Sequence, residues 1–415
     1  MLEFYDLPLL KDKIYNEKVE LLPSVTELFE LEMANLEFQI VKPEQHYERL
    51  SYFQSINGKT TRHYEMLKDA NENLQEGRST LTKKYFQSGN FSTGYCTHGL
   101  FPYRGKFHPQ LIKAIMNIIG IEPGDTIIDP MCGSGTANIE AAINGINSLA
   151  LDLSPFCRFM TKVKYESLTI DNQLLAQAYD KKEKLFAFFL ENRLKLKQKF
   201  LEIGDSEKLK VYELSLLAFF DSMGYSIRVK TSSHEQLFYK VLKRYIETLK
   251  DYLENKKPFV NHLGKLRILE GSALKIPLEN ETVDAVITSP PYSFAIDYLE
   301  NDKIQLEFLD YNIEEIRTEM IGLRGKSKKD KLENYFIDMN LVCREVSRIL
   351  KPNKYFVMII GSNTNQTGGI RLEQNIIDSC KEYHLELKKT IIKPIKGMRN
   401  TMKEEYILFF KKEEL

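Results

Sequence analysis

The chain has 415 residues, of which 43% are hydrophobic and 28% are charged, a composition typical of globular proteins. Its 58 Lys and Arg residues balance its 58 Asp and Glu residues, which excludes a global electric field that would draw it to nucleic acid. No apolar run approaches the roughly 20 residues of a membrane span, and the first residues lack the features of a signal peptide. The five cysteines are scattered without a CxxC pair, so we expect reduced thiols in a cytoplasmic protein and no metal site.

Residues 1–95 are predicted to form an N-terminal extension that is mostly helical. One helix is expected after Leu21–Ser24, and a second stretch with helical spacing runs from Tyr47 to Glu76. The simplest interpretation is a layer that packs against the rest of the protein. A long loop rich in glycine and aromatic residues follows from Ser88 to Pro109, and it leads into an amphipathic helix at Gln110–Ile119.

A glycine loop, Asp129-Pro130-Met131-Cys132-Gly133-Ser134-Gly135, lies between a predicted strand and a predicted helix at 137–144. Its two glycines permit positive φ and a close approach of a ligand to the backbone, and the helix end supplies unpaired N–H groups. A second short strand ends at Asp152, whose carboxylate suits the hydroxyl groups of a ribose. Because the loop is neither G-x-G-x-x-G nor a phosphate loop, it indicates a nucleoside without a pyrophosphate.

Residues 155–265 change in pattern and are predicted to form a helical insertion. Long helices are expected at 172–204, 206–222 and 233–255, with a polar break at Gly224–Ser233. Basic residues outnumber acidic residues here, although the whole chain is neutral. The basic face is either a solvated helical surface or a nucleic-acid contact, and the sequence favours neither.

The sheet is expected to resume after residue 265. Further strands are predicted at 266–272, 284–288, 355–361, 385–392 and 406–410, with helices at 294–311 and 332–350. Alternation of strands and helices predicts a doubly wound, mainly parallel sheet.

One of these strands ends in an unusual motif, Thr288-Ser289-Pro290-Pro291-Tyr292. Two consecutive prolines fix two φ angles and remove two backbone donors, so the chain must leave the sheet rigidly. Their carbonyl groups are then fixed acceptors, with a hydroxyl before them and an aromatic ring after them. This combination suits a site that holds a planar amine.

With both motifs in place, the chain resembles the S-adenosylmethionine-dependent amino-methyltransferases of DNA, over about 97–153 and 266–410. The glycine loop matches the family's cofactor loop, and the proline motif matches its catalytic motif. Within that family, Ser as the first motif residue is typical of enzymes that make N4-methylcytosine, whereas Asp or Asn is typical of N6-methyladenine enzymes. The resemblance implies an α/β fold with a Rossmann-like, seven-stranded, mainly parallel sheet that contains one antiparallel strand.

The resemblance also implies S-adenosylmethionine as the cofactor. Ser289 Oγ and the Pro290 carbonyl are expected to accept the two N–H groups of the target amine, while Tyr292 stacks on a base flipped out of the duplex. Ser272 stands where many relatives carry an Asp, which weakens the expected adenine contact. The predicted catalytic residues are Ser289, Pro290, Pro291 and Tyr292, and the predicted cofactor-binding residues are His108, Pro109, Asp129, Pro130, Cys132, Gly133, Gly135, Asp152 and Ser272.

The expected organisation is an N-terminal extension at 1–95, a catalytic domain at 96–154 and 266–415, and the insertion at 155–265. Within the insertion, Tyr225–His234 is a candidate for DNA recognition, as is the later loop Arg324–Lys329. The expected partners are double-stranded DNA and, in a restriction-modification system, a cognate restriction endonuclease. Three alternatives stay open: an N6-adenine DNA methyltransferase, an RNA or tRNA amine methyltransferase, and, least favoured, a non-catalytic nucleic-acid-binding protein.

Overall fold

The computed structural model describes residues 14–22, 25, 27–67, 94–103, 105–192, 206–228, 231–291, 297–361, 369–395 and 404–414. Tyr292 of the proline motif and Arg104 of the aromatic loop therefore lie outside the described residues. Within the described ranges, no helix has both the length and the apolar character needed to cross a bilayer.

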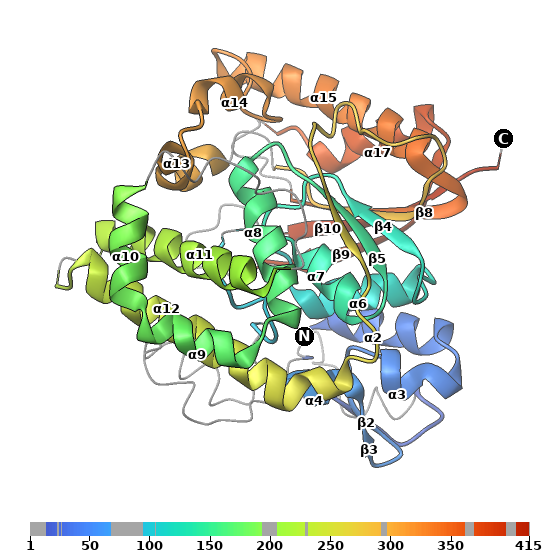
Figure 1. The fold of residues 1–415 in the computed structure, drawn as a ribbon. Helices are drawn as coiled ribbons and strands as arrows, with labels where there is room; N and C mark the ends of the chain where they lie inside the picture. The colour runs from blue at the N-terminus through green and yellow to red at the C-terminus, as the bar shows by residue number, and fades with distance from the viewer. Residues whose placement is uncertain are drawn as a thin grey trace, which may run out of the picture.

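A β-sheet lies at the centre of the molecule (Figure 1). It has seven strands in the order β6-β5-β4-β7-β8-β10-β9. Strand β10 runs antiparallel to both of its neighbours, and the other pairs are parallel. The predicted Rossmann-like sheet with one antiparallel strand is therefore confirmed. The strands are β4 (Thr126–Asp129), β5 (Asn147–Leu151), β6 (Leu266–Leu269), β7 (Val283–Thr288), β8 (Leu350–Gly361), β9 (Leu385–Pro394) and β10 (Glu404–Lys412).

Helices cover both faces of this sheet, because successive side chains of each strand point to opposite sides. Ile127 and Val357 pack with helices α2 (Leu28–Ile40) and α6 (Pro109–Ile118) on one face. Their chain neighbours Ile128 and Phe356 pack on the other face. There they meet helices α15 (Lys328–Ile349) and α17 (Leu372–Glu382). The result is a three-layer sandwich whose strands are buried on both sides.

The order of the strands determines where a ligand can bind. The chain runs outward from β4 to β5 and β6 on one side, whereas β7 and β8 lie on the other side of β4. In open α/β sheets, ligands bind at such a switch point, outside the carboxyl ends of the strands. The glycine loop leaves β4 and the proline motif leaves β7 at this edge.

The N-terminal extension contains a small antiparallel sheet as well as helices. Its strands are β1 (Val19–Leu21), β2 (Phe53–Ile56) and β3 (Lys59–Thr60), and its short helices are α3 (His46–Arg49) and α4 (Arg62–Leu67). The helical prediction for Tyr47–Glu76 is therefore wrong over residues 50–61, while residues 68–76 lie outside the described ranges. Asn57 and Gly58 both have positive φ and form a tight hairpin turn, as an Asn-Gly pair favours.

A buried carboxylate fixes this extension to the catalytic layer. Glu37 of α2 accepts hydrogen bonds from the backbone N–H groups of Ser51 and Tyr52 at 2.9 and 2.8 Å. Its second oxygen accepts one from Asn117 Nδ2 of α6 at 2.9 Å. Because a buried polar group is costly unless it is hydrogen-bonded, this network fixes α2 against α6.

The insertion is helical, but its helix boundaries differ from the prediction. The expected helix at 172–204 is broken at Lys181 into α9 (Asn172–Asp180) and α10 (Lys182–Glu191). The expected break at Gly224 is absent, because α11 (Glu207–Arg228) continues through it. One glycine costs a helix only about 1 kcal/mol, less than the apolar face of α11 gains by burial. Helix α8 (Pro155–Glu166) precedes these helices, and α12 (His234–Asp251) follows them.

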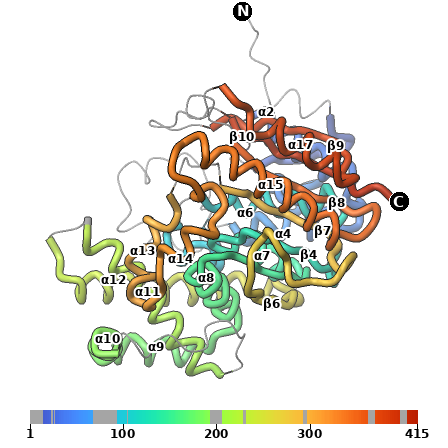
Figure 2. Tube along the Cα trace, turned by 90° about the horizontal axis from the view of Figure 1, so that it is seen from above, coloured from blue at the N-terminus to red at the C-terminus, as the bar shows by residue number. Residues whose placement is uncertain are grey.

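An aromatic core holds these helices together at one side of the molecule, away from α15 and α17 (Figure 2). Phe219 of α11 packs against Phe308 of α13 (Tyr298–Phe308) with ring centroids 5.4 Å apart. Helix α13 comes after the proline motif, so the helical layer is built from both the insertion and the C-terminal part of the chain.

Candidate active site

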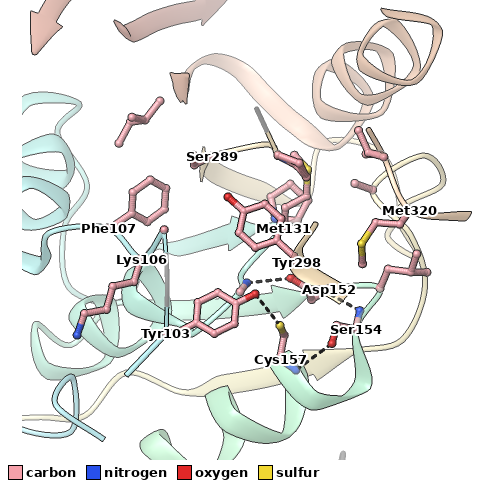
Figure 3. Close-up of a pocket in the computed structure, with 18 of the residues that line it drawn as sticks. Tyr103, Lys106, Phe107, Met131, Asp152, Ser154, Cys157, Ser289, Tyr298 and Met320 are labelled. Atoms are coloured by element: carbon pink, nitrogen blue, oxygen red, sulfur yellow. Dashed lines mark hydrogen bonds between the residues drawn. The ribbon is translucent and has the colours of Figure 1, made fainter. Parts of the chain in front are cut away.

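A cavity of about 300 Å³ lies at the carboxyl ends of the central strands (Figure 3). Seven of the residues predicted from sequence line it, from segments far apart in the chain. They are His108, Pro130, Gly133, Asp152, Ser272, Ser289 and Pro291. The structure therefore brings the glycine loop, the end of β5 and the proline motif to one cavity, at the edge of the sheet where ligands bind.

The glycine loop is held to the end of β5 by Asp152. The Gly133 N–H donates to Asp152 Oδ2 at 2.8 Å, and the Ser154 N–H donates to Oδ1 at 2.8 Å. Burial raises the pKa of Asp152, while these two hydrogen bonds counteract the rise. Gly133 adopts φ +49°, a conformation that favours glycine, and it lines the cavity. Asp152 is thus an oriented carboxyl beside a backbone that a ligand can approach closely.

Gly135 has a different role from Gly133. It is the N-cap of α7 (Thr136–Ile143) and has φ +75°. A Cβ atom added there would lie 2.5 Å from Thr161 Oγ1 of α8. Gly135 therefore allows α7 and α8 to approach closely, and it is absent from the cavity lining.

Asp129 is fully buried and connects the two motifs instead of lining the cavity. Thr288 Oγ1 donates to Asp129 Oδ1 at 2.7 Å, and the Met131 N–H donates to the same oxygen at 3.2 Å. Burial raises the pKa of Asp129 to about 7. Since Thr288 immediately precedes Ser289, this contact fixes the start of the proline motif relative to the glycine loop.

Three further predicted residues are buried and do not line the cavity. Pro109 is the first residue of α6, Cys132 packs with Ala150 and Leu266, and Pro290 is buried between two partly exposed residues of the proline motif. Each of them shapes a loop whose neighbours reach the cavity. The predicted stacking residue, Tyr292, lies outside the described residues, so its position is untested.

Several lining residues were missed by the sequence analysis. Tyr103 Oη lies 3.4 Å from Cys157 Sγ, and the ring of Tyr298 also borders the cavity (Figure 3). Asp302 of α13 lines it as well. Tyr103 belongs to the loop rich in glycine and aromatic residues between Ser88 and Pro109. The others lie on helices and carry no local signal.

The lining carries more acidic than basic side chains. Its acids are Asp152, Asp302, Glu319 and Glu405, and its bases, besides His108, are Lys106 and Lys393. Lys393 forms an ion pair with Glu405, and Lys106 Nζ donates to the His98 carbonyl at 3.1 Å. Such a cavity suits a ligand with hydroxyl groups and a positive charge better than a phosphate.

The cysteines offer no alternative chemistry in the part of the chain that the structure describes. All five are free thiols and buried. Burial raises the pKa of the Cys132 and Cys157 thiols, which disfavours the reactive thiolate. Among the described residues, no group of His, Cys, Asp and Glu side chains is arranged to hold a metal ion.

Comparison with known proteins agrees with this geometry. Residues 283–415, which begin with the strand that carries the proline motif, match the DNA methylase family. The chain is related to the DNA amino-methyltransferases. Residues 100–248 match a second family, described as an RMKL-like methyltransferase domain. The two matches together include both the glycine loop and the proline motif.

Individual relatives include two Type II methyltransferases. M.BsoBI of Geobacillus stearothermophilus is 26% identical over 324 residues, which cover 62% of this chain and 62% of that protein. The chain thus spans less than two thirds of the length of this relative. M.MvaI of Kocuria varians is 21% identical and covers 77% of this chain and 89% of its own. A solved geranyl diphosphate methyltransferase in complex with SAM has a TM-score of 0.35, at 10% identity, and covers 76% of this chain and 95% of its own.

S-adenosylmethionine is the cofactor of this methyltransferase-like site. The cavity fits it, because the backbone of Gly133 and the oriented carboxyl of Asp152 border an acidic space. Its volume of about 300 Å³ lies at the lower end of the range for small-molecule sites. Gly133, Asp152 and Ser272 would hold the cofactor there.

Proposed function

We propose that the protein methylates the exocyclic N4 amine of cytosine in double-stranded DNA. The observation that carries the proposal is the presence of Ser289 and Pro291 in the same cavity as Gly133 and Asp152. The match of residues 283–415 to the DNA methylase family supports DNA as the substrate. The similarity to two Type II methyltransferases supports the same substrate. A role in a restriction-modification system with a cognate endonuclease stays a prediction.

The proline motif suits this chemistry for a physical reason. The lone pair of a cytosine amine is delocalised into the ring, so the nitrogen becomes nucleophilic only when its N–H groups are held out of the ring plane. Ser289 Oγ accepts one N–H and the Pro290 carbonyl accepts the other, while Tyr292 stacks on the ring. Bound S-adenosylmethionine supplies the methyl group, so the catalytic contribution of the chain is mainly to position the amine.

The target base must leave the duplex to reach this cavity. Unstacking costs a few kcal/mol, and an aromatic partner such as Tyr292 partly offsets that cost. The contact between Asp129 and Thr288 supports the rigid placement of Ser289 that such a mechanism needs.

Two other substrates compete with N4-cytosine. Ser289 weighs against an adenine amine, for which the resemblance predicts Asp or Asn. An RNA amine is favoured by one observation, a match of 38% identity over 53 residues to the tRNA (guanine(10)-N2)-dimethyltransferase of Methanothermobacter thermautotrophicus, which covers 13% of this chain and 16% of that protein.

Incubation of the purified protein with labelled S-adenosylmethionine and either duplex DNA or tRNA separates these cases. We expect label in DNA as N4-methylcytosine; label in adenine or in tRNA contradicts the proposal.

The surface that contacts DNA is proposed to include the loop at the start of α15. Arg324 does not belong to this surface, because it pairs with the buried Asp338. Lys326 and Lys328 are exposed and form no described ion pair. The same segment contributes Met320 and Ile321 to the cavity, so these lysines lie close along the chain to the site.

The candidate Tyr225–His234 is less favoured as a contact surface. His234 packs between the rings of Phe186 and Phe219, with centroid distances of 5.1 and 4.9 Å. Its Nε2 lies 3.0 Å from Ser222 Oγ. His234 therefore belongs to the aromatic core of the helical layer. Lys230 and the side chain of Arg228 lie outside the described residues.

We expect the double substitution Lys326→Gln and Lys328→Gln to weaken DNA binding and reduce its salt dependence. Each lost phosphate contact lowers the slope of log K against log salt by about 0.9, so the slope should fall by about 2. Fluorescence anisotropy with a labelled duplex at several salt concentrations measures this slope. The matched control is Lys240→Gln with Lys243→Gln, which changes two exposed lysines of α12 in the insertion. A smaller slope in this control would indicate that the insertion also contacts phosphates. An unchanged slope in the loop variant excludes the loop.

A further inference from the structure

The buried acidic residue Asp302 has no role in the proposed chemistry. Asp302 lies on α13, is 3% exposed and lines the cavity. Its one described hydrogen bond is with Cys157 Sγ, at a distance of 3.8 Å. A thiol is a weak donor, so a buried carboxyl in this position is poorly satisfied by the described part of the protein.

The charged groups around Asp302 do not compensate for its missing hydrogen bonds. The described groups that act on it are Asp152, which is also acidic, and the Cys157 thiol. Burial, with a smaller contribution from Asp152, raises the pKa of Asp302 to about 8. Within the described ranges no Lys, Arg or His forms an ion pair with it. Because Asp302 lines the cavity, a donor group of a bound ligand can supply the hydrogen bond that the described part of the protein does not.

Asp152 and Asp302 differ in what they can still bind. Both oxygens of Asp152 already accept backbone N–H groups, from Gly133 and Ser154. The carboxyl of Asp302 retains most of its hydrogen-bonding capacity and borders the same cavity.

We propose that Asp302 is a second acidic residue of the cofactor site and hydrogen-bonds the nucleoside part of S-adenosylmethionine. Its partner is a ribose hydroxyl or the adenine amine, because these are the donor groups of a nucleoside. The proposal rests on the assignment of the cavity to this cofactor, and it does not depend on which base or polymer is methylated. Helix α13 would then contribute a contact to the cofactor in addition to that of Asp152.

Isothermal titration calorimetry without DNA tests the proposal. The ligands are S-adenosylmethionine and 5′-methylthioadenosine, which keeps the nucleoside and lacks the amino-acid end. We expect Asp302→Ala to weaken the binding of both ligands about 10- to 100-fold, as expected for the loss of a hydrogen bond by a buried group. Asp302→Asn retains a polar side chain of the same shape and should lose less. The matched control is Glu300→Gln, an exposed acid on the same helix, which should leave both affinities unchanged.

The possible failures can be told apart. Equal affinities in wild type and Asp302→Ala overturn the proposal and leave the proposed methylation untouched. A loss for S-adenosylmethionine without a loss for 5′-methylthioadenosine also overturns it, because the contact then lies at the amino-acid end. If wild type binds neither ligand, the cofactor assignment fails together with the proposal. Thermal unfolding of the ligand-free variants shows that each is folded.

Discussion

Replacement of Ser289 by alanine should lower kcat for DNA methylation about 10²- to 10³-fold, the usual effect of removing one hydrogen-bonding group aimed at a reacting centre. The dissociation constant for S-adenosylmethionine should stay nearly unchanged, because Gly133 and Asp152 remain in place. The expected pattern is thus a loss in kcat without a matching loss in cofactor affinity. Single-turnover methylation of a duplex, together with calorimetric titration of the cofactor, measures both quantities.

A serine away from the cavity provides the control for this experiment. Ser347 of α15 donates to the Tyr383 carbonyl at 2.8 Å and is not part of the lining. Ser347→Ala should therefore keep its turnover. Wild-type turnover in Ser289→Ala would refute the role of this hydroxyl, whereas loss of cofactor binding would indicate a collapsed site.

Gly135→Ala should destabilise the protein by about 2–5 kcal/mol. A left-handed backbone costs an alanine about 1–2 kcal/mol, and the new Cβ would overlap Thr161 in a packed core, which adds about 1–3 kcal/mol. The overlap follows from a Cβ position 2.5 Å from Thr161 Oγ1. Because Gly135 is the N-cap of α7 and ends the glycine loop, cofactor affinity should fall as well. Urea unfolding measures the change in the free energy of unfolding.

Gly120→Ala separates the two causes of this loss. Gly120 has φ +71°, close to the +75° of Gly135, but a Cβ atom added there would meet nothing within 4 Å. The Gly120→Ala variant should therefore lose only about 1–2 kcal/mol of unfolding free energy, which is the backbone contribution, and it should keep its affinity for the cofactor. Equal losses in the two variants would contradict the close approach of α7 and α8.

Much of the fold could be predicted because the strands of the sheet are strongly patterned. Apolar runs bounded by turn residues, such as Val283–Thr288, are a clear signal for strands. The errors in the predicted helices arose where a turn signal was overlooked or where tertiary packing overrode a local signal. The helix prediction over Tyr47–Glu76 overlooked the Asn57-Gly58 turn, and the predicted break at Gly224 gave a single glycine more weight than the packing of α11 allows.

The residues of the candidate site could also be predicted only in part. Gly133, Asp152 and Ser289 could be predicted, because each lies in a motif at the end of a strand and parallel strands end at a common edge. Asp302 could not, because its helix reaches the cavity through packing against α11. Asp129 shows an intermediate case, since its motif was evident but its side chain bonds Thr288 instead of facing the cavity.

The position of the helical insertion also affects how the protein folds. Strand β6 pairs in parallel with β5, yet the chain between them contains helices α8 to α12. Loop-closure entropy opposes such a pairing until the intervening chain has become compact. Strand β6 should therefore join the sheet after α8–α12 have assembled. The Ser272 side of the cavity, which follows β6, is then among the last parts of the catalytic centre to form.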